Sequence, residues 1–326
     1  MTPTERALAH VRALFPSPGP ALTAPVTVNF HPDRPLADGR TVAEHLATDG
    51  VYRTQYETGI SNGGLGGDRP VWEQRMFGGD YTRPVYGALN LAGHPDGAAP
   101  RFGSCHLILA PHVLGRATFS LGDSHTHPEL LGTADSFGTI WNGLLEQVDR
   151  TGQALAVTAT GRHAWAAALT APRTGAGRAL DDYVEAQIHG GLSLHTDVTA
   201  IAADPSFRGT PTERHLRRLN LPIRWQPGFQ LPAAEFPADL RGAEIPPLAR
   251  TIAGRYRQPD LDAALLGRAA RDGDHPQLVK YLWHILVMRG RPAVSHRPAT
   301  DRTPTTSPDA PPGPRRRPRN PSPRHS

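Results

Sequence analysis

The chain has 326 residues, of which 38% are hydrophobic, and its formal net charge is +5 at neutral pH. That length suits one large domain or two small ones. The single cysteine, Cys105, excludes a disulfide framework and a cysteine zinc site. No run of about 18 apolar residues occurs, and the first residues lack the basic start and apolar core of a secretory signal. We therefore expect a cytoplasmic protein without a membrane partner.

Residues 291–326 form a segment rich in proline and arginine with almost no apolar side chains. Such a segment cannot bury enough surface to offset the entropy lost on ordering, so we predict a disordered tail. Much of the excess positive charge lies here, which makes the net charge only a weak indication of nucleic-acid binding. The tail is expected to contact anionic partners without reading their sequence.

The N-terminal part is predicted to run helix, strand, helix, strand. Two threonines, each followed three residues later by glutamate, predict helix starts at Thr2 and Thr41. The alternation of apolar and polar residues in Val26–Phe30 predicts a half-buried strand whose polar side ends at His31. Residues 51–56 are predicted to return as a second strand.

The rest of the chain mixes strands and helices without internal repeats. Residues 58–67 are so rich in glycine that they predict a loop. Further strands are predicted at residues 85–91, 102–109, 117–121, 183–189, 198–203 and 223–225. Helices are predicted near residues 68–78 and 137–148, before Pro172, from Thr210, and from about residue 238 to Gly290, the last one capped by Asp274.

These elements predict an α+β protein in four parts. An N-terminal helix (residues 1–20) precedes an α+β domain (residues 21–230). A helical C-terminal extension (residues 231–290) and the disordered tail (residues 291–326) follow.

Glu185 is the strongest single candidate for a functional residue. In the strand around it, Glu185, Gln187 and His189 share one face. Three hydrogen-bonding side chains in a row are unusual for a core strand, and they have two interpretations. The face is either exposed to solvent, or it presents a carboxylate that stabilises developing positive charge.

Other candidates also have an ordinary structural interpretation beside the functional one. His31 is either a ligand-binding residue or a strand-end histidine bonded to a loop carbonyl. Tyr52 and Tyr56 are either binding residues or sheet aromatics. The segment that contains Ser61 and Asn62 is either part of a site or only a turn.

The order of these residues resembles the His–Tyr–Glu branch of the ADP-ribosyltransferase fold, which is related to diphtheria toxin and the poly(ADP-ribose) polymerases. The resemblance is carried by Phe30-His31, by Gly50-Val51-Tyr52 and by Glu185. It implies a split β-sheet core with flanking helices. It also implies NAD as a substrate, no metal, and an unknown protein or nucleic-acid acceptor.

The same resemblance implies roles for individual residues. His31 would bind the adenosine ribose, Tyr52 would stack on nicotinamide, and Glu185 would hold the nicotinamide ribose. Three further residues are assigned to NAD binding on the same basis, namely Tyr56, Ser61 and Asn62. Arginine-directed relatives usually carry glutamate two residues before the catalytic glutamate, so Gln187 is a second candidate for the catalytic position.

Over about residues 5–250 the chain resembles more closely an uncharacterised bacterial family, domain of unknown function 3626. The matching motifs are HPDR, YRTQYETGISNGG, RFGSCHL, DDYVEAQIHG and DPSFRGTP. This resemblance implies no activity.

Two alternative functions remain. A metal-dependent hydrolase would use a cluster of His and acidic residues with hard-metal or zinc spacing, namely His125, His127, Glu129, His31 and Asp33. A non-catalytic binding module would instead use the basic tail, and deleting the tail would abolish its salt-dependent affinity.

Overall fold

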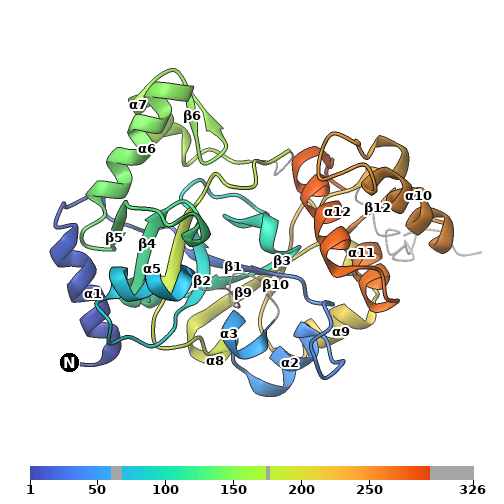
Figure 1. Cartoon of the computed structure of the whole chain (residues 1–326), viewed down its shortest axis with the longest axis horizontal. Helices are drawn as coiled ribbons and strands as arrows, with labels where there is room; N and C mark the ends of the chain where they lie inside the picture. Colours follow the sequence, from blue (N-terminus) through green and yellow to red (C-terminus); the bar gives the residue numbers. More distant parts are fainter. Residues whose placement is uncertain (60–67, 174–176, 294–326) are drawn as a thin grey trace, which may run out of the picture. The chain divides into compact units, whose positions relative to one another are not determined.

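A mixed eight-stranded sheet forms the centre of the fold (Figure 1). The structure is a computed structural model that describes residues 1–59, 68–173 and 177–293, and residues Met1–Ala293 form one compact unit. In spatial order the strands are β10 (Ile223–Trp225), β9 (Val198–Ala203), β3 (Cys105–Leu109), β1 (Val26–Phe30), β2 (Val85–Leu89), β8 (Val184–Ile188), β4 (Ala117–Leu121) and β5 (Leu131–Thr133). Neighbours are antiparallel, except that β9 and β10 are parallel.

The sheet confirms the α+β class and most predicted strands. Its strands hydrogen-bond into one continuous sheet, so the split core that the resemblance implies is not seen in the described ranges. Two small hairpins lie outside it, β6 (Gln153–Ala154) with β7 (Val157–Thr158) and β11 (Leu231–Pro232) with β12 (Asp260–Leu261).

Helices surround the sheet and connect its strands. They are α1 (Pro3–Leu14), α2 (Val42–Asp49), α3 (Gln55–Thr58), α5 (Asp68–Phe77), α6 (Gly138–Thr151), α7 (Arg162–Ala168), α8 (Leu194–Asp197), α9 (Pro211–Arg217), α10 (Ile245–Tyr256), α11 (Ala263–Arg271) and α12 (Pro276–Arg289). Short 3-10 turns include η1 (Pro100–Phe102) and η3 (Ser124–Thr126). No helix in the described parts of the chain is both long enough and apolar enough to cross a membrane.

Local capping chemistry explains where several helices begin. The predicted capping boxes at Thr2 and Thr41 are both present. The predicted strand at residues 51–56 is wrong, because Thr54 and Glu57 form a third capping box that starts α3. Val51 makes only an isolated bridge, to Ser193. The cap of α12 is His275, not the predicted Asp274.

Both faces of the sheet are buried, which corrects two expectations. All five residues of β1 are buried, so this strand is not half-buried. All five residues of β8 are buried as well, so the face that carries Glu185 and Gln187 is not a solvent-exposed face. Helix α5 packs on this polar face, where the Phe77 ring lies 4.9 Å from that of His189.

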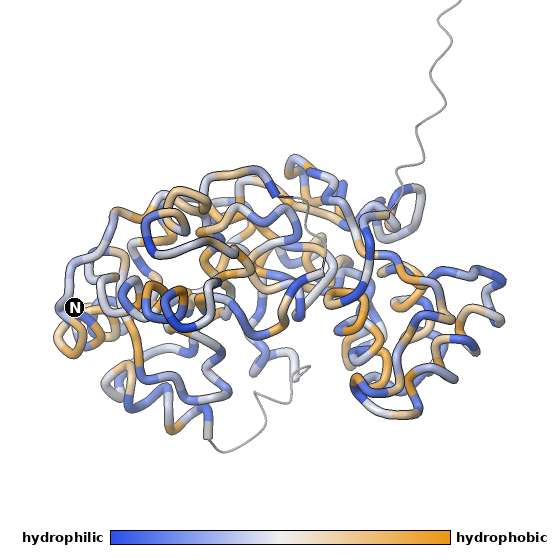
Figure 2. Tube along the Cα trace, turned by 90° about the horizontal axis from the view of Figure 1, so that it is seen from above, coloured by the Kyte–Doolittle hydropathy of each residue, from blue (hydrophilic) through white to orange (hydrophobic). Residues whose placement is uncertain are grey.

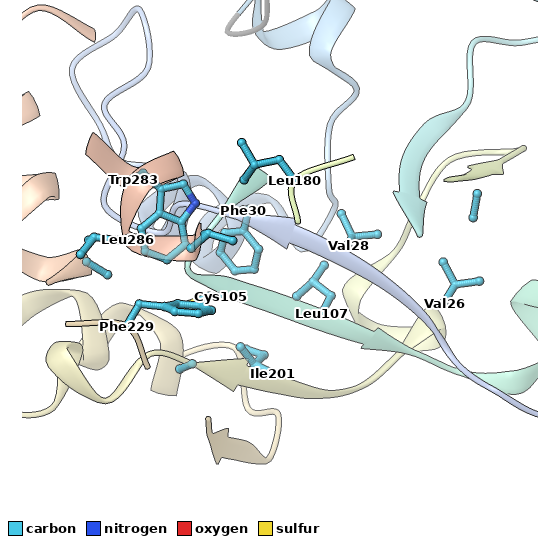
Figure 3. Close-up of a cluster of buried hydrophobic side chains, with 14 of the residues drawn as sticks. Val26, Val28, Phe30, Cys105, Leu107, Leu180, Ile201, Phe229, Trp283 and Leu286 are labelled. Atoms are coloured by element: carbon cyan, nitrogen blue, oxygen red, sulfur yellow. The ribbon is translucent and has the colours of Figure 1, made fainter. Parts of the chain in front are cut away.

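The opposite face of the sheet is apolar and holds the main core. Figure 3 shows Val28 and Phe30 along β1 with Leu107 on β3, and Trp283 of α12 near Phe30. Helix α6 packs against the same face, with Phe137 at its start and Phe119 of β4 5.7 Å apart. Hydrophobic residues follow the strands and inner helix faces, while many connecting loops are hydrophilic (Figure 2).

Candidate functional site

A cavity of about 190 Å³ lies against the polar side of the central strands. His31, Tyr52 and Glu185 all line it, although they are far apart in the sequence. The cavity also contacts β2 through Tyr86 and the α5 region through Arg69. The structure therefore brings the three predicted residues together.

Each of the three residues reaches the cavity through a local structural device. His31 follows β1 directly, and Pro32 after it cannot continue the strand. The backbone N–H of Tyr52 donates to the carbonyl of Leu192 at 2.9 Å, which fixes the segment between α2 and α3. Glu185 is the second residue of β8 and lies opposite Ser120 of β4.

Glu185 is a buried carboxyl group, only 3% exposed. Its Oε1 accepts a hydrogen bond from the backbone N–H of Ser124 at 3.2 Å and another from Nε2 of Gln187 at 3.0 Å. Burial, helped by the negative charge of Asp123 and opposed by the positive charge of Arg69, raises its pKa to about 8. This carboxyl group is therefore largely protonated at neutral pH.

Gln187 is fully buried beside Glu185 and does not line the cavity. The Thr118 hydroxyl donates to its Oε1 at 2.9 Å, while its Nε2 donates to Ser120 Oγ and to Glu185. These bonds use both ends of the amide. The arrangement suits Gln187 to holding Glu185 in place and not to contacting a ligand.

His31 and Tyr52 are uncharged at neutral pH. Burial, together with the charge of Arg34, lowers the pKa of His31 to about 3. Burial raises the pKa of Tyr52 to about 12. The Tyr52 ring meets Phe30 edge-on with centroids 6.1 Å apart, and the His31 ring meets Trp283 at 5.1 Å. Both rings offer stacking surface and neutral hydrogen bonding to a ligand.

Of the other predicted binding residues, Tyr56 does not join this group. Tyr56 lies on α3 and does not line the cavity; its hydroxyl donates to Glu73 Oε1 at 3.2 Å. Ser61 and Asn62 lie outside the described residues.

A buried carboxylate that no sequence motif indicated, Glu73 of α5, lies beside the cavity through its contact with Tyr86. Its side chain is fully buried and accepts hydrogen bonds from the hydroxyls of Tyr56, Tyr81 and Tyr86. The guanidinium of Arg83 lies 3.4 Å from it. These partners come from separate segments, so no local pattern in the sequence could have indicated the cluster.

A second missed group links this cluster to Glu185. Arg69 lines the cavity, with its guanidinium carbon 4.6 Å from the centroid of the Tyr86 ring. Its Nη2 lies 3.4 Å from Asp123 Oδ1. The positive charge of Arg69 thus pairs with Asp123 and also acts on the carboxyl group of Glu185.

The histidine cluster of the metal-hydrolase alternative does not form a metal site in the described ranges. No group of three His, Cys, Asp or Glu side chains there could hold a metal ion. Asp33 instead pairs with Arg271 at 3.1 Å.

Comparison with known proteins places the chain in a family. The family model described as "Protein of unknown function (DUF3626)" matches residues 25–289, which is most of the chain. The chain belongs to this family. A similar curated protein is "Gene 2 protein" of Mycobacterium phage D29, 35% identical over 82 residues, or 25% of this chain and 32% of that protein. The chain therefore matches about a third of the length of this curated relative.

Proposed function

We propose that the protein binds NAD in the cavity between His31, Tyr52 and Glu185 and breaks the bond between nicotinamide and ribose. It would act as an ADP-ribosyltransferase toward an unknown acceptor, or as an NAD glycohydrolase when water is the acceptor. One observation carries the proposal: these three residues, in the order typical of the His–Tyr–Glu transferases, line one cavity.

The chemistry requires stabilisation of positive charge on the ribose. As the C1′–N bond breaks, its electron pair leaves with nicotinamide, and the ribose gains oxocarbenium character. A lone pair of the acceptor then bonds to C1′, and the acceptor loses its proton to solvent. A buried carboxylate stabilises this positive charge more strongly than a carboxylate in water does, because little solvent screens its charge.

The protonation of Glu185 fits this role in a specific way. Its pKa of about 8 arises chiefly because burial disfavours the charged form. The positive charge of the nicotinamide ring would favour ionisation when NAD binds. The carboxylate would then become charged where positive charge develops.

Nicotinamide release from NAD by the purified protein tests the proposal. Glu185→Gln keeps the shape and the hydrogen bonds of the side chain but removes its charge, so turnover should fall by orders of magnitude while NAD still binds. Alanine at His31 or Tyr52 should chiefly raise KM. The matched control is Glu129→Gln, an exposed glutamate, which should leave turnover unchanged.

The same control separates the metal-hydrolase alternative. NAD cleavage would be contradicted by two results together. The protein would fail to bind NAD at millimolar concentration, and its activity would be lost in Glu129→Gln or in the presence of a chelator. Greater damage from Gln187→Ala than from Glu185→Gln would show that the catalytic residue has been misassigned.

A further inference from the structure

His284, on α12, is a buried side chain whose hydrogen-bonding capacity is unused. It is 2% exposed, and neither Nδ1 nor Nε2 has a hydrogen-bond partner among the described residues. Buried polar groups in folded proteins nearly always have a partner, so an imidazole with two unpaired nitrogens indicates a missing ligand or solvent group.

The charged groups that act on His284 are all basic. They are Arg241, Arg101 and Lys280. Burial and these charges lower the pKa of His284 to about 3, so its ring is neutral. Lys280 precedes His284 by four residues, which places both side chains on one face of α12. The neutral ring of His284 thus lies among three cations.

Contacts on one side of α12 place Arg241 near His284. The guanidinium carbon of Arg241 lies 5.6 Å from the Tyr281 ring centroid, and the Tyr281 and His284 rings are 6.2 Å apart. Lys280 is exposed and forms no hydrogen bond or ion pair with any residue that the structure describes. Both cations are therefore available to an incoming anion.

Helix α12 is also fixed against η1. Trp283 Nε1 donates to the carbonyl of Pro100 at 2.8 Å, and Arg101 comes next in the chain. Arg101 is shared with Asp123, at 3.6 Å, and with Asp181. Its charge is therefore only partly available.

The basic group adjoins one end of the cavity. Phe102, which follows Arg101, lines the cavity, and so does His31, whose ring contacts Trp283. A molecule that fills the cavity near His31 would reach the basic group through its own anionic part.

We propose that His284, Lys280, Arg241 and Arg101 bind a phosphate group at the His31 end of the cavity, and that this phosphate belongs to the dinucleotide. Only the identity of the dinucleotide rests on the proposed function. Guanidinium and ammonium groups donate charge-assisted hydrogen bonds to phosphate oxygens, and the buried imidazole gains an acceptor for its N–H.

Lys280 offers a direct probe because it is the only lysine in the chain. Reductive methylation with ¹³C-formaldehyde keeps its charge and gives one side-chain NMR resonance besides that of the N-terminal amine. Inorganic pyrophosphate should shift the Lys280 resonance with saturation at millimolar concentration. NAD should shift the same resonance, and pyrophosphate should compete with it.

Two pairs of variants distinguish specific binding from general charge effects. Arg241→Ala should weaken the binding of pyrophosphate about tenfold or more, which is the loss expected for a charge-assisted hydrogen bond. Arg250→Ala, on the exposed side of α10, should leave this binding unchanged. His284→Gln should weaken the binding of pyrophosphate by a similar factor. His163 is an exposed histidine on α7, and His163→Gln should not weaken this binding. Because Arg241 is exposed, its variant remains informative even if His284→Gln misfolds.

The outcomes separate the two proposals. A Lys280 resonance that pyrophosphate does not move, or that moves equally in Arg241→Ala and Arg250→Ala, would overturn the phosphate site. A response to pyrophosphate but not to NAD would overturn the assignment to the dinucleotide. A response to both without any nicotinamide release would overturn NAD cleavage alone.

Discussion

The charge of Glu185 is set by its surroundings and not by its place in the strand. Burial raises its pKa from 4.5 to about 8. At pH values between these two pKa values, Glu185 keeps its proton in the folded protein but has already lost it in the unfolded chain. In this range unfolding releases a proton, and that release becomes easier as pH rises. The contribution of Glu185 to the free energy of unfolding therefore falls from about pH 4.5 to pH 8.

Glu185→Gln should remove this pH dependence. The variant should match the native protein near pH 4.5 and become more stable than it towards pH 9, since glutamine has no proton to lose. Each kcal/mol gained should raise Tm by about 2–4 °C. Thermal unfolding across this pH range measures the effect, with exposed Glu129→Gln as the control. A Tm difference that stays constant with pH would contradict the buried, protonated state.

At the scale of elements, α12 supports the His31 end of the cavity. Trp283 is 1% exposed, contacts the rings of His31 and Phe229, and donates a hydrogen bond to Pro100. The residue thus joins the C-terminal helices to the end of β1. Trp165 of α7 is equally buried but packs against Trp141 and bonds to Ala154, away from the cavity-lining residues.

These two tryptophans make a matched pair for mutation. Trp283→Ala and Trp165→Ala should each cost about 3–5 kcal/mol of unfolding free energy, because each leaves a large space in the core. Only Trp283→Ala should also weaken NAD binding, since it releases the His31 ring. Denaturant unfolding and NAD titration measure the two effects. Equal loss of NAD affinity in both variants would mean that α12 has no special role at the cavity.

At the scale of the whole molecule, the hydrogen-bonded body extends beyond Gly290. The backbones of Arg291 and Gln230 exchange two hydrogen bonds of 2.9 Å, and the N–H of Ala293 donates to the carbonyl of Pro227. Residues up to Ala293 therefore belong with the compact unit, so a tail beginning at residue 291 would start three residues too early.

Truncation after Ala293 should leave the stability unchanged. Truncation after Gly290 should cost about 1–3 kcal/mol, because it removes three main-chain hydrogen bonds of modest net value. Thermal unfolding of the two shortened chains beside the full chain makes the comparison. If the chain that ends at Ala293 had a lower Tm than the full chain, residues after 293 would contribute to the fold.

The sequence by itself determined the local features of this protein. Period-two alternation predicted β1 and β8, and the Thr-x-x-Glu pairs predicted the starts of α1 and α2, because these signals depend on neighbours within a few residues. The order of His31, Tyr52 and Glu185 could also be recognised. Thr54 carries the same capping signal, but the alternation of Tyr52 and Tyr56 around it favours a strand at residues 51–56.

Only the tertiary structure decided which polar residues are buried and what they contact. Helix α5 covers the face that carries Glu185 and supplies Glu73 and Arg69, while α12 supplies Trp283 and His284 beside His31. The contacts of His189 with α5 and of His31 with α12 join residues more than fifty positions apart. The sheet order places β8 between β2 and β4. The ionisation of Glu185 follows from that burial, so no pattern within its own strand could have shown it.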